Sequence, residues 1–367
     1  MFTRFLFKPH ESIKAILAIL LSVIIITSFS SCAIKNNSEQ NHLVYYTLND
    51  EDSLSWIIEK YNKYCINSNN PSFQVEIVKF DSEQEMSTQI STEIMAGSGP
   101  DIISLSQKLP FEKLIESRSL MNIYDLLKDD NSSNAINLDD YNVNILNAGV
   151  YDNGLYIVPL FYGVDVLVST EERLKNFDIK ENNGFSLTYS NFSDVFENYF
   201  LNDEGYSFVS NELSDFLWFD YPMQLFCRFL NSYVDFENKA VYFDTDEFKD
   251  NLDVMMQMLT ISQKNNTNEL FDGLYINRSF PLMAGSYSYY QSINETPVVF
   301  RGLTKNKDVN SAHIQVGYAI NNNTQLKEQA LAFIKYTLSD EIQEIGATAS
   351  GSLSFPVNMS GYDNAKL

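Results

Sequence analysis

Apolar and polar positions follow two different periods in the part of the chain that comes after the N-terminal segment. Residues 43–48 and 73–80 alternate between apolar and polar side chains, which predicts two strands. Residues 54–65 and 86–94 repeat their apolar side chains every three or four positions, which predicts two amphipathic helices. Residues 101–105 form a short, mostly apolar run, as in a strand covered on both faces. This order predicts a parallel β-α-β-α-β unit with right-handed crossovers.

The second of these helices carries recognisable start and stop signals. Ser82 and Glu85 have the spacing of a capping box. Gly97 can adopt the left-handed conformation that ends a helix, and the Gly-Pro pair two residues later favours an extended exit. Asp101 follows that pair directly, and we expect it to hold the turn rather than to bind a ligand.

Two later segments also have a readable pattern. A turn on Asn153-Gly154 leads into two strand-like runs that are broken by Pro159 and Gly163. Further on, Thr245 stands at the N-cap position of a predicted helix. The side chains expected to face inward from that helix are Leu252, Met255, Met256 and Leu259.

Length and charge narrow the class of protein. With 367 residues the chain is long enough for two domains, and hydrophobic residues make up 44% of it. The formal charge of the chain is −23, and the sequence has no stripe of basic residues. Proteins that bind nucleic acid use such residues to neutralise phosphates and release their counterions. Nucleic acid is therefore excluded as a partner, and so is an anionic membrane surface bound through basic residues.

The N-terminus is predicted to be a targeting segment rather than part of the fold. Three basic residues precede the apolar run 15–27, which has the length of a secretory h-region. Small residues directly before Cys32 resemble a lipobox, so residues 1–31 are predicted to be a lipoprotein signal peptide and 32–42 a tether. Cys32 would then be lipidated. The remaining cysteines, Cys65 and Cys227, lie among apolar neighbours and are expected to be buried free thiols.

Several ordered phrases resemble one family. They are the Ala-Gly-x-Gly-Pro-Asp turn at 96–101, Gly-Tyr-Ala-Ile at 317–320, the apolar helix phrase at 330–336 and Pro-Val-Asn at 356–358. Together they resemble extracellular solute-binding protein family 1, the maltose-binding-protein-like lipoproteins of ABC importers. The resemblance implies an α/β fold with two lobes of the class II periplasmic-binding-protein type. Each lobe would be a mostly parallel sheet flanked by helices, with the ligand cleft between them.

The resemblance also sets the expected domain boundaries and setting. Lobe 1 is predicted over residues 43–160 and 280–322, and lobe 2 over 161–279 and 323–367. A member of this family acts as a monomer that is lipid-anchored on the extracellular face of the bacterial cytoplasmic membrane. Its expected partners are a small-molecule solute and the permease subunits of the transporter.

No catalytic constellation is found in the sequence, so the chain is predicted not to be an enzyme. It lacks a Gly-x-Ser-x-Gly elbow, a Walker loop and a Gly-x-Gly-x-x-Gly motif. No Cys pair has metal spacing and the three His residues form no metal motif, so neither a metal nor a cofactor is expected. The segment 129–134 is acidic but lacks the Gly and the terminal Glu of a calcium loop, and it is interpreted as solvated.

A sugar receptor needs flat aromatic faces for pyranose rings, with amides and hydroxyls for the sugar hydroxyls. The loops that follow parallel strands open on one edge of a sheet, where open α/β sheets bind ligands. Segments predicted to reach that edge, or to line the family's cleft, supply the candidate ligand contacts. These candidates are Thr47, Asn49, Gln107, Phe161, Tyr162, Trp218, Tyr221, Tyr287 and Tyr289.

The identity of the solute stays open at this level. The resemblance and the supply of aromatic residues favour a carbohydrate, and an oligosaccharide in particular. The second choice is a cationic or zwitterionic solute of the polyamine kind, which an acidic, Tyr-rich cleft could hold by cation–π contact. A secreted glycan-active enzyme or an adhesin on the same scaffold is the alternative from another class of protein.

Overall fold

The computed structural model describes the chain in stretches. It divides into two compact units, Met1–His42 and Leu43–Leu367, and the described residues belong to the second unit except for His42. Among these residues, no helix combines the length and the apolar content that a membrane crossing needs. The described stretches are 42–48, 54–105, 109–128, 130–164, 166–170, 186–188, 226–227, 229–235, 238–264, 275–277, 297–304, 312–348 and 355–364.

A six-stranded mixed sheet is the centre of the first half of the fold. Its strand order is β14-β6-β13-β3-β1-β2. β1 is parallel to both β2 and β3, as the order of strands and helices predicts, whereas β13 is antiparallel to β3 and β6. The sheet is thus parallel only at one edge. The strands are β1 (Leu43–Leu48), β2 (Val75–Phe80), β3 (Ile102–Ser104), β6 (Val158–Val164), β13 (Ala312–Ile320) and β14 (Phe355–Pro356).

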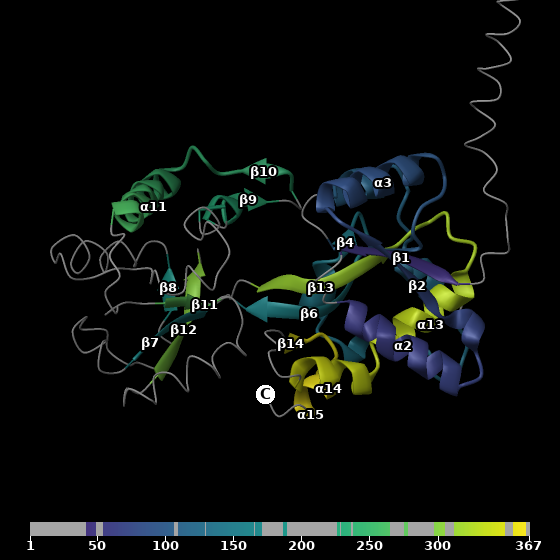
Figure 1. Cartoon of the computed structure of the whole chain (residues 1–367). Helices are drawn as coiled ribbons and strands as arrows, with labels where there is room; N and C mark the ends of the chain where they lie inside the picture. The colour runs from purple at the N-terminus through teal and green to yellow at the C-terminus, as the bar shows by residue number, and fades with distance from the viewer. Residues whose placement is uncertain are drawn as a thin grey trace, which may run out of the picture. The chain divides into compact units, whose positions relative to one another are not determined.

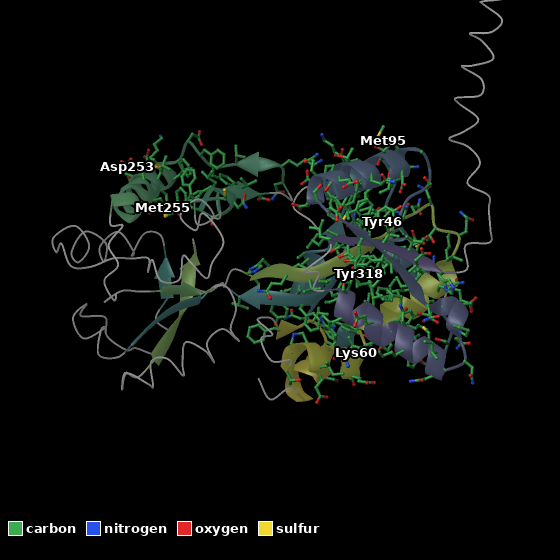
Figure 2. The ribbon with its side chains drawn as sticks, viewed as in Figure 1. Tyr46, Lys60, Met95, Asp253, Met255 and Tyr318 are labelled. Carbon is green, nitrogen blue, oxygen red and sulfur yellow. The ribbon has the colours of Figure 1, made fainter. Side chains whose placement is uncertain are left out.

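Helices cover both faces of this sheet (Figure 1). Tyr45 and Ile102 point into the larger core on the α2 side, while Ile103 and the partly buried Tyr46 point to the α3 side. Figure 2 shows Tyr318 within the packed layer and Met95 at the outer surface. On the α2 side lie α2 (Ser55–Asn67), α5 (Ile123–Lys128), α6 (Val143–Asn147), α13 (Lys327–Thr337) and α14 (Asp340–Thr348), and on the other lie α3 (Glu83–Met95) and α4 (Phe111–Glu116).

Short elements complete this part of the chain. The hairpin turn falls on Asp152 and Asn153, which both have positive φ, one residue earlier than predicted. β6 runs through Pro159 and Gly163 without a break, which the sequence pattern did not predict. The short elements are η1 (Pro71–Phe73), η2 (Leu138–Asp140), β4 (Val150–Tyr151), β5 (Gly154–Leu155) and α15 (Met359–Asn364).

A second, four-stranded sheet has the order β11-β7-β12-β8. β7 is antiparallel to both of its neighbours, and β12 is parallel to β8. A short hairpin and one long helix accompany it in the sequence. These elements are β7 (Val166–Thr170), β8 (Ser186–Thr188), β9 (Val234–Asp235), β10 (Ala240–Val241), α11 (Asp246–Lys264), β11 (Tyr275–Asn277) and β12 (Pro297–Thr304).

The N-cap predicted for α11 is present in the structure, whereas only part of the predicted set of inward-facing side chains is buried. The Phe248 N–H donates to Thr245 Oγ1 over 3.2 Å, which confirms the predicted cap. Met255 is buried, but the Met256 side chain is 48% exposed. The side chains of successive helix residues point about 100° apart around the helix axis, so two adjacent residues do not both face a narrow buried surface.

The predicted lobe boundaries are wrong at the C-terminal side. Phe333 and Ile334 of α13 are buried in the same core as Leu43 of β1, and β14 pairs with β6. The described residues of 323–367 therefore belong to the first sheet and not to lobe 2. β12, predicted within lobe 1, pairs with β7 in the four-stranded sheet. An amphipathic stripe shows that a helix is buried but not which sheet buries it.

The turn after α3 forms as the sequence predicts. Ser82 Oγ accepts the Glu85 N–H over 3.2 Å at the start of the helix. At its end Gly97 has φ of +78°, and its N–H donates to the Ile94 carbonyl. The Ser98 N–H donates to the Glu93 carbonyl over 2.9 Å, which completes a Schellman motif.

Asp101 has the structural role expected of it. Its Oδ2 accepts the Val44 N–H over 2.8 Å, and its carboxylate also bonds the Thr324 side chain. The residue is 4% exposed, and burial raises the pKa of the carboxyl group above its usual value. The Asn321 N–H donates to the Asp101 carbonyl over 2.9 Å. Asp101 thus joins the start of β1, the turn after α3 and the segment after β13.

The two described cysteines differ in exposure. Cys65 is a buried free thiol, as predicted. Cys227 is exposed, so the prediction of a second buried thiol is wrong. Apolar neighbours in the sequence indicate burial only when the element that carries them turns that face inward.

Candidate functional site

The carboxyl ends of β1 and β3 lie side by side, which creates one edge of the six-stranded sheet. Tyr45 pairs with Ile102, so the parallel register brings Thr47 level with Ser104. Thr47 is almost completely buried, and its hydroxyl donates to the Leu48 carbonyl over 3.3 Å. Thr47 therefore supports this edge from within the sheet.

β6 and β13 continue past this edge as an antiparallel ribbon. Ser104, the last residue of β3, pairs with Tyr318 of β13. β13 residues before Gly317 pair with β6, Val316 with Phe161 and Ile314 with Tyr162. The register shifts on both sides of Val316, which is a bulge of the kind that redirects side chains near binding sites. Phe161 and Tyr162 thus lie on β6 beyond the carboxyl end of β3.

Tyr162 is held in place and is still partly exposed. Asn142 Nδ2 donates to the Tyr162 hydroxyl over 3.3 Å. The Tyr162 ring lies 5.5 Å from the ring of Phe355 in β14, with an interplanar angle of 32°. A fixed aromatic face with a polar tip suits a ligand that has both apolar and hydroxyl surfaces.

Phe161 is a core residue. Its side chain is 3% exposed and packs against Gly346 of α14. A Cβ atom at Gly346 would overlap Cζ of Phe161 and lie 2.5 Å from Cε1. The Phe161 ring fills the space that a side chain at position 346 would need. Packing therefore explains both the burial of Phe161 and the glycine at position 346.

The other predicted contacts fall outside the described residues. They are Asn49, Gln107, Trp218, Tyr221, Tyr287 and Tyr289, together with the lipidation candidate Cys32. The members of the predicted set that lie within the described residues are Thr47, on β1, and Phe161 and Tyr162, on β6 of the same sheet.

One known protein family matches most of this chain. A family model described as bacterial extracellular solute-binding protein matches residues 56–366. The chain belongs to this family. A search of curated proteins found no match.

Solved structures of other solute-binding proteins share the two-lobed fold. The sugar-binding protein MalE from Xanthomonas citri gives a TM-score of 0.62 at 11% identity, covering 89% of this chain and 82% of that one. An ABC substrate-binding protein from Listeria monocytogenes, solved in complex with cycloalternan, gives 0.59 at 13% identity, with 89% and 83% covered. A sugar transporter from Rhizobium etli in an open conformation gives 0.57 at 16%, with 86% and 80% covered.

Two further residues of this solute-binding protein are candidates for the strand-end site. Trp56 is half-buried in the first turn of α2, the helix that enters directly after β1. Asn142 precedes α6 and orients Tyr162. Neither was among the predicted contacts. Trp56 could have been found, since it is one of two Trp residues in the chain and follows the first strand-to-helix loop.

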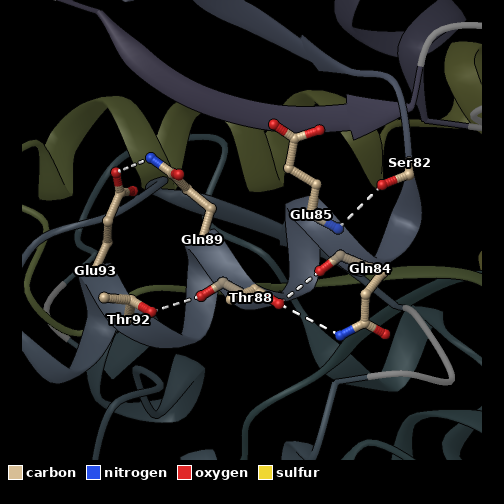
Figure 3. Close-up of a pocket in the computed structure, with 7 residues that line it drawn as sticks. All are labelled: Ser82, Gln84, Glu85, Thr88, Gln89, Thr92 and Glu93. Carbon is tan, nitrogen blue, oxygen red and sulfur yellow. Dashed lines mark hydrogen bonds between the residues drawn. The ribbon is translucent and has the colours of Figure 1, made fainter.

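A hollow along α3 is a weaker candidate (Figure 3). It has a volume of about 490 Å³, and most of its polar side chains already form hydrogen bonds with their neighbours along α3. Thr88 Oγ1 donates to the Gln84 carbonyl over 2.7 Å, and Gln89 Nε2 donates to Glu93 Oε1 over 2.6 Å. Few groups remain to bind a ligand there. In the part of the chain that the structure describes, no cluster of His, Cys, Asp and Glu could hold a metal ion.

Proposed function

We propose that this solute-binding protein captures a carbohydrate, in particular an oligosaccharide, and delivers it to the permease subunits of an ABC importer. The observation that carries the proposal is the family match over residues 56–366. The sugar is supported by the similar structures, one bound to cycloalternan and two named for sugar. Proteins of this family bind solutes rather than transform them, which argues against a glycan-active enzyme.

Capture would require the two lobes to close on the ligand about the connections between the two sheets. Closure excludes water and so strengthens each hydrogen bond to the sugar. Tyr162 and Trp56 supply aromatic faces at the strand-end edge, and Asn142 holds the Tyr162 hydroxyl. Residues from the rest of the chain would complete the site. These proposed contacts are Asn49, Gln107, Trp218, Tyr221, Tyr287 and Tyr289.

A thermal-shift screen tests the solute class. Residues 33–367 are assayed against monosaccharides, oligosaccharides and polyamines. A bound oligosaccharide at about one hundred times its Kd should stabilise the protein by about 2.7 kcal/mol. The absence of a shift with any sugar would overturn the carbohydrate proposal, and a polyamine shift that Trp218→Ala abolishes would favour a cationic solute at the same site. Turnover of a labelled oligosaccharide would instead reveal an enzyme.

Two variants connect such a shift to the proposed contacts. Trp218→Ala and Tyr162→Ala should each weaken sugar binding, because each removes a stacking face. Tyr151→Ala, at an exposed tyrosine elsewhere in the first sheet's domain, serves as the matched control. Equal affinity in Trp218→Ala or in Tyr162→Ala would remove that residue from the site.

We also propose that Cys32 carries a lipid, which anchors the monomeric protein on the outer face of the cytoplasmic membrane. In a bacterial host the chain should be labelled by a palmitate analogue and should sediment with membranes. Cys32→Ser should lose the label and the sedimentation, whereas Cys227→Ser, at an exposed thiol, should keep both. Labelled, membrane-bound Cys32→Ser protein would show that the anchor lies elsewhere.

A further inference from the structure

A pocket separate from the strand-end site lies between α2, α13 and the loop at 130–134. Its volume is about 580 Å³, and tyrosines, carboxylates and amides line it. Tyr64 lies eight residues after Trp56 in α2, which is about 12 Å along the helix axis. α2 leads away from the carboxyl end of β1 toward the start of β2, so the pocket lies toward the opposite edge of the sheet.

One wall of the pocket already binds an ammonium group of the protein itself. Lys335 Nζ lies 2.6 Å from Asp130 Oδ2 and donates to Ser132 Oγ over 2.6 Å and to Asn134 Oδ1 over 3.2 Å. The Lys335 ammonium and the Ser132 side chain lower the pKa of Asp130 to about 2. The prediction of a merely solvated loop is therefore wrong for Asp130, whose side chain is largely covered.

Another part of the lining is aromatic and open to solvent. Tyr64 is 53% exposed, and its ring centroid lies 5.1 Å from that of Tyr336. Tyr61 lies beneath them, 5.1 Å from Tyr336, and is 1% exposed. The buried rings fix the orientation of Tyr336, so the Tyr64–Tyr336 pair offers a preformed aromatic surface.

The pocket carries an excess of negative charge. Asp130, Glu328 and Glu341 line it together with the single cation Lys335, which leaves two net negative charges. Burial and the neighbouring Glu341 carboxylate raise the pKa of Tyr336 to about 12. Within the described stretches, neither Glu328 nor Glu341 forms an ion pair. Both carboxylates remain available to a cation from solution.

We propose that this pocket is a second binding site, for a protonated organic amine. The ammonium would lie against the faces of Tyr64 and Tyr336 and donate to the Glu341 carboxylate, as Lys335 donates to Asp130 in the same pocket. Tyrosine faces attract cations through their ring quadrupole, and a carboxylate strengthens the hydrogen bond. A neutral sugar would gain the stacking but not the charge. The site is independent of the carbohydrate site proposed above.

Isothermal titration of the purified protein with spermidine tests this site. Tyr64→Ala should weaken spermidine binding by about twofold to fivefold, the value of an exposed cation–π contact. Glu341→Gln should weaken it by a similar factor or more, and both side chains are exposed, so the fold should persist. Tyr151→Ala, at an exposed tyrosine outside the pocket, should bind as the wild type does. The uncharged 1,8-octanediol should not bind.

Unchanged spermidine affinity in both Tyr64→Ala and Glu341→Gln would overturn the proposal, and so would equal binding of the diol. The carbohydrate proposal is tested by a separate measurement, the thermal shift with an oligosaccharide. Trp218→Ala should leave spermidine binding unchanged, and Tyr64→Ala should leave the oligosaccharide thermal shift unchanged. Loss of one response with the other intact identifies which site is wrong.

Discussion

Gly346→Ala is expected to lower the free energy of unfolding by about 3 kcal/mol, at the upper end of the usual cost of overpacking a core. The sign is the opposite of the ordinary effect, because Gly to Ala within a helix stabilises by about 0.5–1 kcal/mol. The reason is the Phe161 ring, whose Cζ atom would overlap with the added Cβ. The ring belongs to a packed core and cannot move aside freely.

A double-mutant cycle measured by urea unfolding checks this packing. Phe161→Leu makes room, so the double variant should be more stable than the sum of the single effects predicts, by about 1–2 kcal/mol. Thr348→Ala, at an exposed position of the same helix, should stay within about 0.5 kcal/mol of the wild type. A stabilising Gly346→Ala, or additive effects, would contradict the contact.

Asp101→Ala is expected to lower the free energy of unfolding by about 2–4 kcal/mol. It leaves the Val44 N–H and the Thr324 side chain without their acceptor, and each loss of a partner to a buried group costs about 1–3 kcal/mol. Asp101→Asn keeps a carbonyl oxygen for the Val44 N–H and should cost less. An equal loss in both variants would show that the hydrogen bonds contribute little.

The pH dependence of these variants has a definite sign. The folded pKa of Asp101 is raised above its unfolded value by burial. Its contribution to stability is therefore fully present below the unfolded pKa and is lost as pH rises through the folded pKa. The stability of the wild type relative to Asp101→Asn should be greater at pH 4 than at pH 7. A pH-independent difference in urea unfolding would refute a raised pKa.

The local elements of the first sheet could be predicted because each residue's own neighbours determine them. The period-two run at 43–48 became β1, with Tyr45 on one face and Tyr46 on the other. The capping and terminating residues of α3 behaved as their chemistry requires, since Ser82 and Gly97 act within one helical turn. Such signals depend on a few adjacent positions only.

Contacts between distant residues could not be predicted in the same way. The assignment of 323–367 failed because α13 is amphipathic whichever sheet buries it. Phe161 was a reasonable ligand candidate by type, but its burial depends on Gly346, which lies far away in the sequence. Likewise Asp130 is covered by Lys335. The aromatic residues near the predicted edge could be identified from the sequence. The sequence did not show which of them are buried in the hydrophobic core.

One structural feature constrains how the molecule can move. β6 ends at Val164 in one sheet and β7 begins at Val166 in the other, with a single residue between them. Neighbouring Cα atoms are about 3.8 Å apart, so these two strand ends can separate by no more than about 7 Å. Any change in the placement of the two sheets therefore has to keep these two strand ends within that distance, whatever the rest of each sheet does.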